Sequence, residues 1–196
     1  MAHTLKPFRD YNEHNVINLF AVQANQDANG VIASAGTVVK VAGNGFQPVV
    51  AGLGGTGFLG AVPVDLAGGA GSTYMNVVSD RFALTAKVVP AASGSLALGI
   101  TLMGVQEYDE NGEKLLFSPR KAAEKGVVVS GQSVPVLTKG MVTYSGSLIS
   151  NQASAGDGVY LSPTAGELST TAGNQTRVGT LLGTPVNNTA VVNLSF

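Results

Sequence analysis

Glycine and proline punctuate the whole chain and limit the length of any regular segment. The 196 residues include 26 Gly and 8 Pro, and the stretches between them are short and rich in β-branched residues. Glycine weakens the interior of a helix or strand, and proline ends or kinks a helix. Short runs separated by turn residues are typical of an all-β sandwich or barrel. We therefore predict an all-β fold, a β-barrel or sandwich.

Two local signals add detail to this fold class. Asn111-Gly112 lies between two apolar runs and predicts a hairpin, because both residues tolerate the positive φ that a two-residue turn needs. The stretch SPRKAAEKG at 118–126 predicts one short helix, with Ser118 as N-cap, Pro119 in the first position and Gly126 at the end. The expected strands are 15–22, 36–41, 46–50, 74–79, 82–89, 96–108, 113–117, 126–131, 133–146, 158–162, 176–183 and 189–196.

Similar short sequence segments recur in the same order in the N-terminal and C-terminal halves of the chain. ASAG occurs at 33–36 and at 153–156, and LGAVPVD at 59–65 matches LGTPVN at 182–187 with one residue deleted. We infer two related β-modules, the first at 15–82 and the second at 139–196. The remaining divisions are an N-terminal arm at 1–14 and linking strands, the hairpin and the short helix at 83–138.

One stretch has the spacing of a dinucleotide-binding loop. Gly52, Gly54 and Gly57 fit G-x-G-x-x-G, and Asp80 follows at about the distance of a ribose-binding acid. Such a loop must open a helix directly, but here the next residues are FLGAVPVDLAGGAGS, which glycine and proline break repeatedly. We interpret these glycines as a loop and a strand bend, and expect no nucleotide or other cofactor.

The chain offers few residues for catalysis or metal binding. It has no Cys, its two histidines are His3 and His14 in the polar N-terminal arm, and no G-x-S-x-G nucleophile elbow occurs. We therefore expect no catalytic residue, no metal site of His or Cys ligands, and no enzyme activity.

Acidic residues do cluster beside the predicted hairpin tip. Glu107, Asp109, Glu110 and Glu113 flank Asn111-Gly112. Carboxylate pairs serve glycosidases, and carboxylates with carbonyl groups bind calcium. The spacing D-E-N-G-E does not match an EF-hand loop, so calcium binding stays an open alternative. The simpler interpretation is that these acids keep an exposed turn soluble.

Charge is scarce and unevenly placed. Charged residues make up 12% of the chain, about half the usual fraction of roughly 25%, and the net charge is −1. This balance gives no bulk attraction to nucleic acid. A weakly charged, nearly neutral surface favours association, so we expect the protein to work within an assembly. The basic residues Arg120, Lys121 and Lys125 share the short helix, where they face solvent, the acidic hairpin or an acidic partner.

The N-terminal sequence MAHTLKPFRDYNEHN has no apolar signal core. No segment approaches the roughly 18 uninterrupted apolar residues that a membrane span needs. We expect a protein made in the cytoplasm of its host cell, without a membrane partner.

Two stretches resemble virion structural proteins of tailed bacteriophages: LKPFRDYNEHNVINLFA at 5–21 and YDENGEKLLFSPRKAAEKGVVVSGQSVPVLTKG at 108–140. The C-terminal pattern GDGVYLSPTAGELSTTAGNQTRVGTLLG…AVVNLSF separately resembles small capsid decoration (cement) proteins. There a G-D-x-V strand, a G-x-L turn and a V-G-x-x-L-G strand recur in a compact β-barrel. Many of those proteins are nearer one barrel in size, whereas this chain has two related modules.

The resemblance implies a non-enzymatic protein on the outer surface of a phage capsid. It would bind the major capsid protein, stabilise contacts between capsid subunits and associate with itself as a dimer or trimer. The arm is expected to become ordered only on the capsid, where it adds a strand to a capsid-protein edge. The candidate contact residues are Lys6, Pro7, Phe8, Arg9, Arg120, Lys121 and Lys125. The alternative is an adhesive head protein that binds host glycan, although the loop tips are small and bland.

Overall fold

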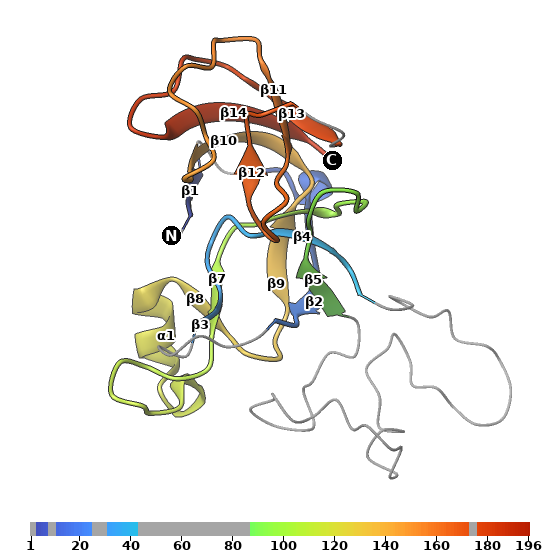
Figure 1. Cartoon of the computed structure of the whole chain (residues 1–196). Coiled ribbons are helices and arrows are strands. Elements are labelled where there is room, and N and C mark those ends of the chain that lie inside the picture. The colour runs from blue at the N-terminus through green and yellow to red at the C-terminus, as the bar shows by residue number, and fades with distance from the viewer. Residues whose placement is uncertain (1–2, 8–10, 25–30, 43–86, 173–175) are drawn as a thin grey trace, which may run out of the picture.

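The computed structural model describes residues 3–7, 11–24, 31–42, 87–172 and 176–196. Within these residues the chain is mostly β, with strands in three sheets and a single α-helix (Figure 1). The predicted all-β fold with a barrel and one short helix is confirmed. The glycine loop at 52–57, Asp80 and the strands expected at 46–50 and 74–79 lie outside the described residues.

Five strands close into a barrel in the order β2, β5, β4, β6, β9. Their bounds are β2 (Val16–Val22), β4 (Val38–Val41), β5 (Lys87–Pro90), β6 (Gly99–Thr101) and β9 (Val134–Leu137). Neighbours are antiparallel except β2 and β5, which run parallel and complete the circle. Val39 and Val136 belong to one buried cluster, whereas Val38 and Leu137 belong to the cluster shared with the second sheet. Successive side chains of a strand point to opposite faces, so the barrel strands serve two cores.

A second, open sheet has six strands in the order β1, β10, β14, β13, β11, β12. Their bounds are β1 (Thr4–Pro7), β10 (Lys139–Ser145), β11 (Gly158–Leu161), β12 (Leu168–Ser169), β13 (Arg177–Leu181) and β14 (Thr189–Ser195). Figure 1 shows this sheet curving over one end of the barrel, joined to it where β9 runs into β10. This sheet contributes Tyr144, Val192 and Leu194 to the shared apolar core.

The third sheet is small and carries the helix. It has three strands, β3 (Val31–Ala33), β7 (Gly104–Gln106) and β8 (Val127–Val129). The helix α1 (Pro119–Lys125) begins with proline and ends at Gly126, whose φ of 65° is the left-handed value that glycine adopts without strain. Both ends agree with the predicted helix, although the Ser118 side chain makes no capping hydrogen bond.

Two local predictions differ from the structure. The stretch 113–117 forms no strand: Leu115–Phe117 is a 3-10 turn, η6, which buries Leu115 against Ala122 of the helix. The Asn111-Gly112 turn is present, but only Gly112 has positive φ, and the turn is closed by the Asp109 side chain. A pair of asparagines with positive φ occurs elsewhere, at Asn187 and Asn188 before β14.

The barrel and the second sheet have the same strand order. Taken along the chain, β2, β4, β5, β6 and β9 correspond to β10, β11, β12, β13 and β14, with the same neighbours in each set except that the pairing of β2 with β5 has no counterpart between β10 and β12. The two ASAG segments form matching turns. The backbone N–H of Thr37 donates to the Ser34 carbonyl, and the backbone N–H of Asp157 donates to the Ser154 carbonyl. Gly36 and Gly156 occupy these turns with φ of 89° and 94°.

This arrangement changes the expected boundaries of the first module. Strands β5, β6 and β9 all lie within 83–138, which the sequence predicted as a link, yet they pair with β2 and β4 from 15–82. The first module therefore extends from β2 to β9, and β7, η6, α1 and β8 lie between its β6 and β9. Apart from β1, the strands of the second sheet run from β10 to β14.

The N-terminal arm also differs from its expectation as an unattached segment. Residues Thr4–Pro7 form β1, which pairs antiparallel with β10 of the same chain. Leu5 is buried in the shared core, and the Tyr11 hydroxyl donates to the Met141 carbonyl at 2.6 Å. The predicted addition of the arm to a capsid-protein edge stays a prediction; in this structure β1 adds to a sheet of its own chain, where Leu5 lies in an apolar site.

Candidate functional site

The basic side chains of helix α1 each have an acidic partner in this chain. Lys121 forms ion pairs with Asp109 and with Glu110, the latter at 3.2 Å, and Lys125 lies 2.5 Å from Glu110. Arg120 pairs with Glu124 one turn along the helix at 2.9 Å, with 91% of the arginine side chain exposed. Of the three basic helix residues predicted as capsid contacts, only Arg120 is fully exposed to solvent.

Asp109 organises the hairpin that these lysines contact. Its Oδ1 accepts the backbone N–H groups of Asn111 at 2.8 Å and Glu113 at 2.7 Å, while Oδ2 bonds Lys121. The hydrogen bond from Lys121, with the two backbone donors, lowers the pKa of Asp109 to about 2. In the same way, hydrogen bonding from Lys125 lowers the pKa of Glu110 to about 2. Both carboxylates therefore stabilise the hairpin and its contact with the helix.

Asp109→Asn is expected to destabilise the protein at pH 7 and to have little effect at pH 2. The carboxylate has a lower pKa in the folded protein than its ordinary 3.8, so it stabilises the fold above that pH. The contribution is lost as the pH falls through about 2, where the wild-type group becomes protonated. Thermal unfolding followed by circular dichroism at pH 7, 4 and 2 measures the difference.

Glu113→Gln is the matched control for Asp109→Asn. Glu113 is exposed on the same hairpin, and it contributes its backbone N–H to Asp109, which the substitution keeps. It should change the free energy of unfolding by less than about 0.5 kcal/mol. A constant difference between Asp109→Asn and wild type across the three pH values would contradict this role for the carboxylate.

The N-terminal contact candidates lie in a different place from the helix. Lys6 and Pro7 are exposed on β1, with Lys6 opposite Thr143 of β10, whereas α1 packs on β8 of the third sheet. Phe8 and Arg9 are outside the described residues. The structure therefore does not bring the two predicted groups of contact residues together.

His3 sits at a buried junction that the sequence did not predict. Its Nε2 lies 3.0 Å from Thr37 Oγ1, its Nδ1 lies 3.8 Å from Glu167 Oε1, and its ring stacks on Tyr144 with centroids 6.1 Å apart. Thr37 belongs to the first module, and Glu167 and Tyr144 to the second. The available signal is alternation: His3 and Leu5 are two residues apart, so they face the same side of a strand.

The hydroxyl, imidazole and carboxylate of this junction are not arranged for nucleophilic attack. Thr37 Oγ1 donates its hydrogen to the Ser34 carbonyl at 2.7 Å, so it accepts a hydrogen bond from His3 Nε2–H. A nucleophilic hydroxyl must instead donate to the imidazole base. Thr37 is also only 4% exposed, which leaves a substrate little access. The junction is suited to holding β1 between the two modules.

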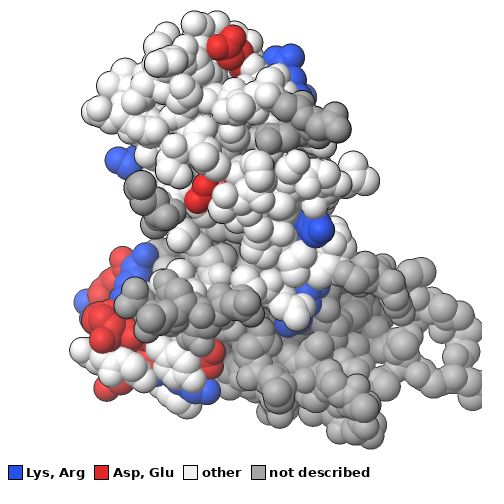
Figure 2. All heavy atoms as spheres, viewed as in Figure 1, with Lys and Arg blue, Asp and Glu red and all other residues white. Residues whose placement is uncertain are grey.

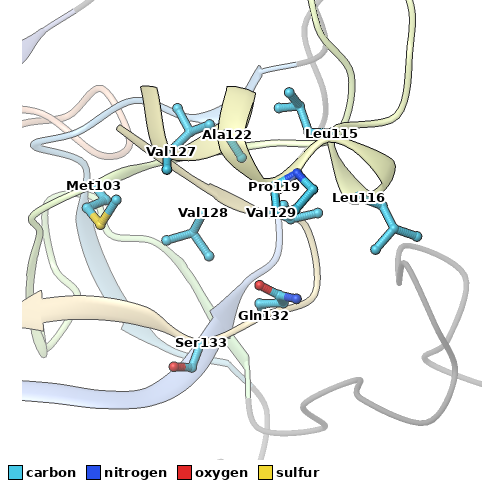
Figure 3. A pocket seen from close by; sticks show the side chains of 11 residues that line it. Met103, Leu115, Leu116, Pro119, Ala122, Val127, Val128, Val129, Gln132 and Ser133 are labelled. Atoms are coloured by element: carbon cyan, nitrogen blue, oxygen red, sulfur yellow. The ribbon is translucent and has the colours of Figure 1, made fainter. Parts of the chain in front are cut away.

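An apolar hollow of about 350 Å³ lies beside helix α1. Figure 3 shows Met103, Val128 and Pro119 around it, with the polar side chains of Gln132 and Ser133 on one side. None of these residues belongs to the predicted contact set. No described residue supplies a charged group to its lining.

Lys87 of β5 is buried without a hydrogen-bond partner for its Nζ. Burial lowers the pKa of this ammonium group.

Among the described residues, no group of three or more His, Asp or Glu side chains could hold a metal ion. The described part of the chain also contains no helix long and apolar enough to cross a membrane.

Charge is concentrated on one part of the visible surface. Figure 2 shows acidic and basic side chains gathered over the hairpin and α1, whereas fewer charged side chains are visible over the second module on this face. Residues 139–196 contain four charged side chains, Lys139, Asp157, Glu167 and Arg177, and Glu167 is buried.

Comparison with known proteins found no matching family model, no similar curated protein and no similar solved structure.

Proposed function

We propose that this protein is a non-enzymatic decoration, or cement, protein of a tailed-bacteriophage head. It binds the outer surface of the capsid, contacts the major capsid protein and stabilises the contacts between neighbouring capsid subunits. It associates with itself on that surface as a dimer or trimer. The observation that best supports this proposal is the surface of the second module, a β-sheet that has almost no surface charge and has exposed apolar side chains.

The loop between β13 and β14 is the best contact surface on that module. Leu182 is 47% exposed and Val186 is 68% exposed, although both side chains are apolar. The adjoining turn is held rigid by Asn188, whose side chain donates to the Ile149 carbonyl at 2.8 Å. A rigid apolar loop loses little conformational entropy on binding, and burial of its side chains supplies affinity.

The charged hairpin and helix support a secondary role. Lys121 and Lys125 already pair with Asp109 and Glu110, so recruiting them to an acidic partner would break existing ion pairs. Lys6 and Pro7 remain exposed on β1 and stay candidate contacts. We therefore assign the main binding energy to the loop at 182–186.

Co-sedimentation with undecorated phage heads tests the proposal. The full-length protein should sediment with heads, and Leu182→Ser combined with Val186→Ser should weaken attachment at least tenfold, which is about 1.4 kcal/mol. Phe117→Ser is the control, because Phe117 is 78% exposed but lies beside α1, away from the second module. Equal weakening by the control would overturn the assignment of this loop.

The outcome also separates the two candidate functions. A cement protein binds heads and raises the temperature at which they release DNA. An adhesive protein would bind host cells or immobilised glycans through the same exposed loops. If wild-type protein fails to bind heads but binds glycan, the adhesive function replaces the one proposed.

A further inference from the structure

The second module lacks the strand pairing that closes the first. In the barrel, β2 pairs with β9 on one edge and with β5 on the other. The corresponding strand β10 pairs with β14, but β12 does not pair with it. The sole described hydrogen bond from β12 to β10 runs from the Leu168 N–H to the Tyr144 hydroxyl, at 3.1 Å. One edge of β10 is therefore left for another strand.

The N-terminal strand β1 occupies that edge. Its register runs from Thr4 opposite Ser145 to Pro7 opposite Val142. Thr4, Lys6 and Pro7 are exposed, so Leu5 is the one buried side chain of the strand. Gly36 makes room for it, since a Cβ at Gly36 would lie 2.9 Å from Leu5 Cβ. A four-residue strand with one buried side chain makes few contacts, so its separation from β10 requires little free energy.

His3 supplies the remaining contacts that hold β1. Of the groups that face it, Glu167 precedes β12, Tyr144 lies on β10, Thr37 precedes β4, and the chain's own N-terminal amine adds positive charge. Glu167 is the only acid among them and lies 3.8 Å away. No other side chain facing His3 carries a negative charge that would favour the protonated imidazole.

We propose that β1 is a releasable strand latched by neutral His3, and that the edge of β10 it leaves accepts β1 of a second copy of this chain. The edge fits that occupant because the structure shows the same segment seated there. Strand exchange between copies would then link neighbouring molecules without new contacts. The inference concerns the chain alone and does not depend on the proposed function.

Acid favours release. Desolvation by burial lowers the pKa of His3 below its ordinary 6.5, and attraction to Glu167 offsets this only in part. The released strand therefore binds the proton more tightly than the seated strand does. Seating is fully favoured above pH 6.5 and weakens as the pH falls below that value.

Disulfide trapping tests exchange, because the natural chain contains no cysteine. Lys6 and Thr143 are directly paired across the two strands, so one full-length variant carries Lys6→Cys and another carries Thr143→Cys. The two are mixed, held at pH 5 or at pH 7.5, returned to pH 7.5 and oxidised. We expect at least tenfold more covalent heterodimer after the step at pH 5.

Two controls make the result specific. Lys6→Cys mixed with Ser195→Cys, an exposed position on β14, measures random disulfide formation and should show no dependence on pH. Adding His3→Gln to the Lys6→Cys chain should abolish the difference between pH 5 and 7.5, whereas His14→Gln should leave it intact. Heterodimer yields that are equal at both pH values, or that match the random control, would overturn the proposal.

A second measurement covers the case in which His3→Gln fails to seat the strand at all. Amide hydrogen exchange on the unsubstituted full-length chain, normalised to intrinsic rates, should show tenfold lower protection of residues 4–6 at pH 5 than at 7.5. Glu167→Gln removes the carboxylate that stabilises protonated His3 in the paired strand, so release should shift to higher pH. An unchanged or lower pH of release in this variant would overturn the role of His3.

Discussion

Replacing Gly99 or Gly179 with alanine is expected to cost about 2–3 kcal/mol of folding stability. The two glycines occupy corresponding places, Gly99 in β6 beside β9 and Gly179 in β13 beside β14. An added Cβ would lie 2.4 Å from the Leu137 carbonyl oxygen in one case and 2.6 Å from the Asn193 carbonyl oxygen in the other. Backbone atoms cannot move aside as a flexible side chain can, so the strands must separate locally.

Thermal unfolding measures this effect. For a chain of this length the midpoint should fall by roughly 4–12 °C in each variant. Gly183→Ala is the control, because no atom lies within 4 Å of its added Cβ. A midpoint for Gly99→Ala equal to that of the control would show that the two strands approach less closely than described.

Tyr144→Ala is expected to cost about 3–5 kcal/mol, since Tyr144 is fully buried at the centre of the shared core. Its hydroxyl also accepts the Leu168 N–H at 3.1 Å, and burial raises its pKa. Tyr144→Phe keeps the ring but leaves that N–H without its partner, which should cost about 1–3 kcal/mol. Urea unfolding of the two variants separates packing from hydrogen bonding.

Tyr160→Phe is the control for the hydroxyl. Tyr160 is half-buried on β11 of the same sheet, and among the described residues its hydroxyl has no hydrogen-bond partner. Its loss should change stability by less than about 0.5 kcal/mol. If Tyr144→Phe were equally mild, the bond to Leu168 would not be what joins β12 to β10.

Turn and helix chemistry could be read from residues close together in the chain. Pro119 and Gly126 bound the helix because proline and glycine act on their own backbone. The hairpin at Asn111-Gly112 was predicted for a similar reason, but its closing group is Asp109, whose role depends on Lys121 from the helix. The prediction of a strand at 113–117 is wrong because Leu115 packs against Ala122 and Val129 instead.

The candidate contact residues show the limit of sequence reasoning about charge. Arg120, Lys121 and Lys125 could face solvent, the hairpin or a partner, and the sequence left these open. The structure pairs Lys121 and Lys125 with the hairpin, because the turn after η6 brings α1 back alongside it. His3 was judged from its place in a polar arm, but its contacts lie 34 and 164 positions away at Thr37 and Glu167.

By itself the sequence determined the secondary-structure class and several turns, since these follow from glycine, proline and β-branched residues acting locally. Only the tertiary structure decided which strands pair. Backbone hydrogen bonds are the same for every residue, so pairing depends on which apolar faces meet in a common core. That is why β5, β6 and β9 joined the first module, and why β1 took the edge of β10 that β12 leaves open.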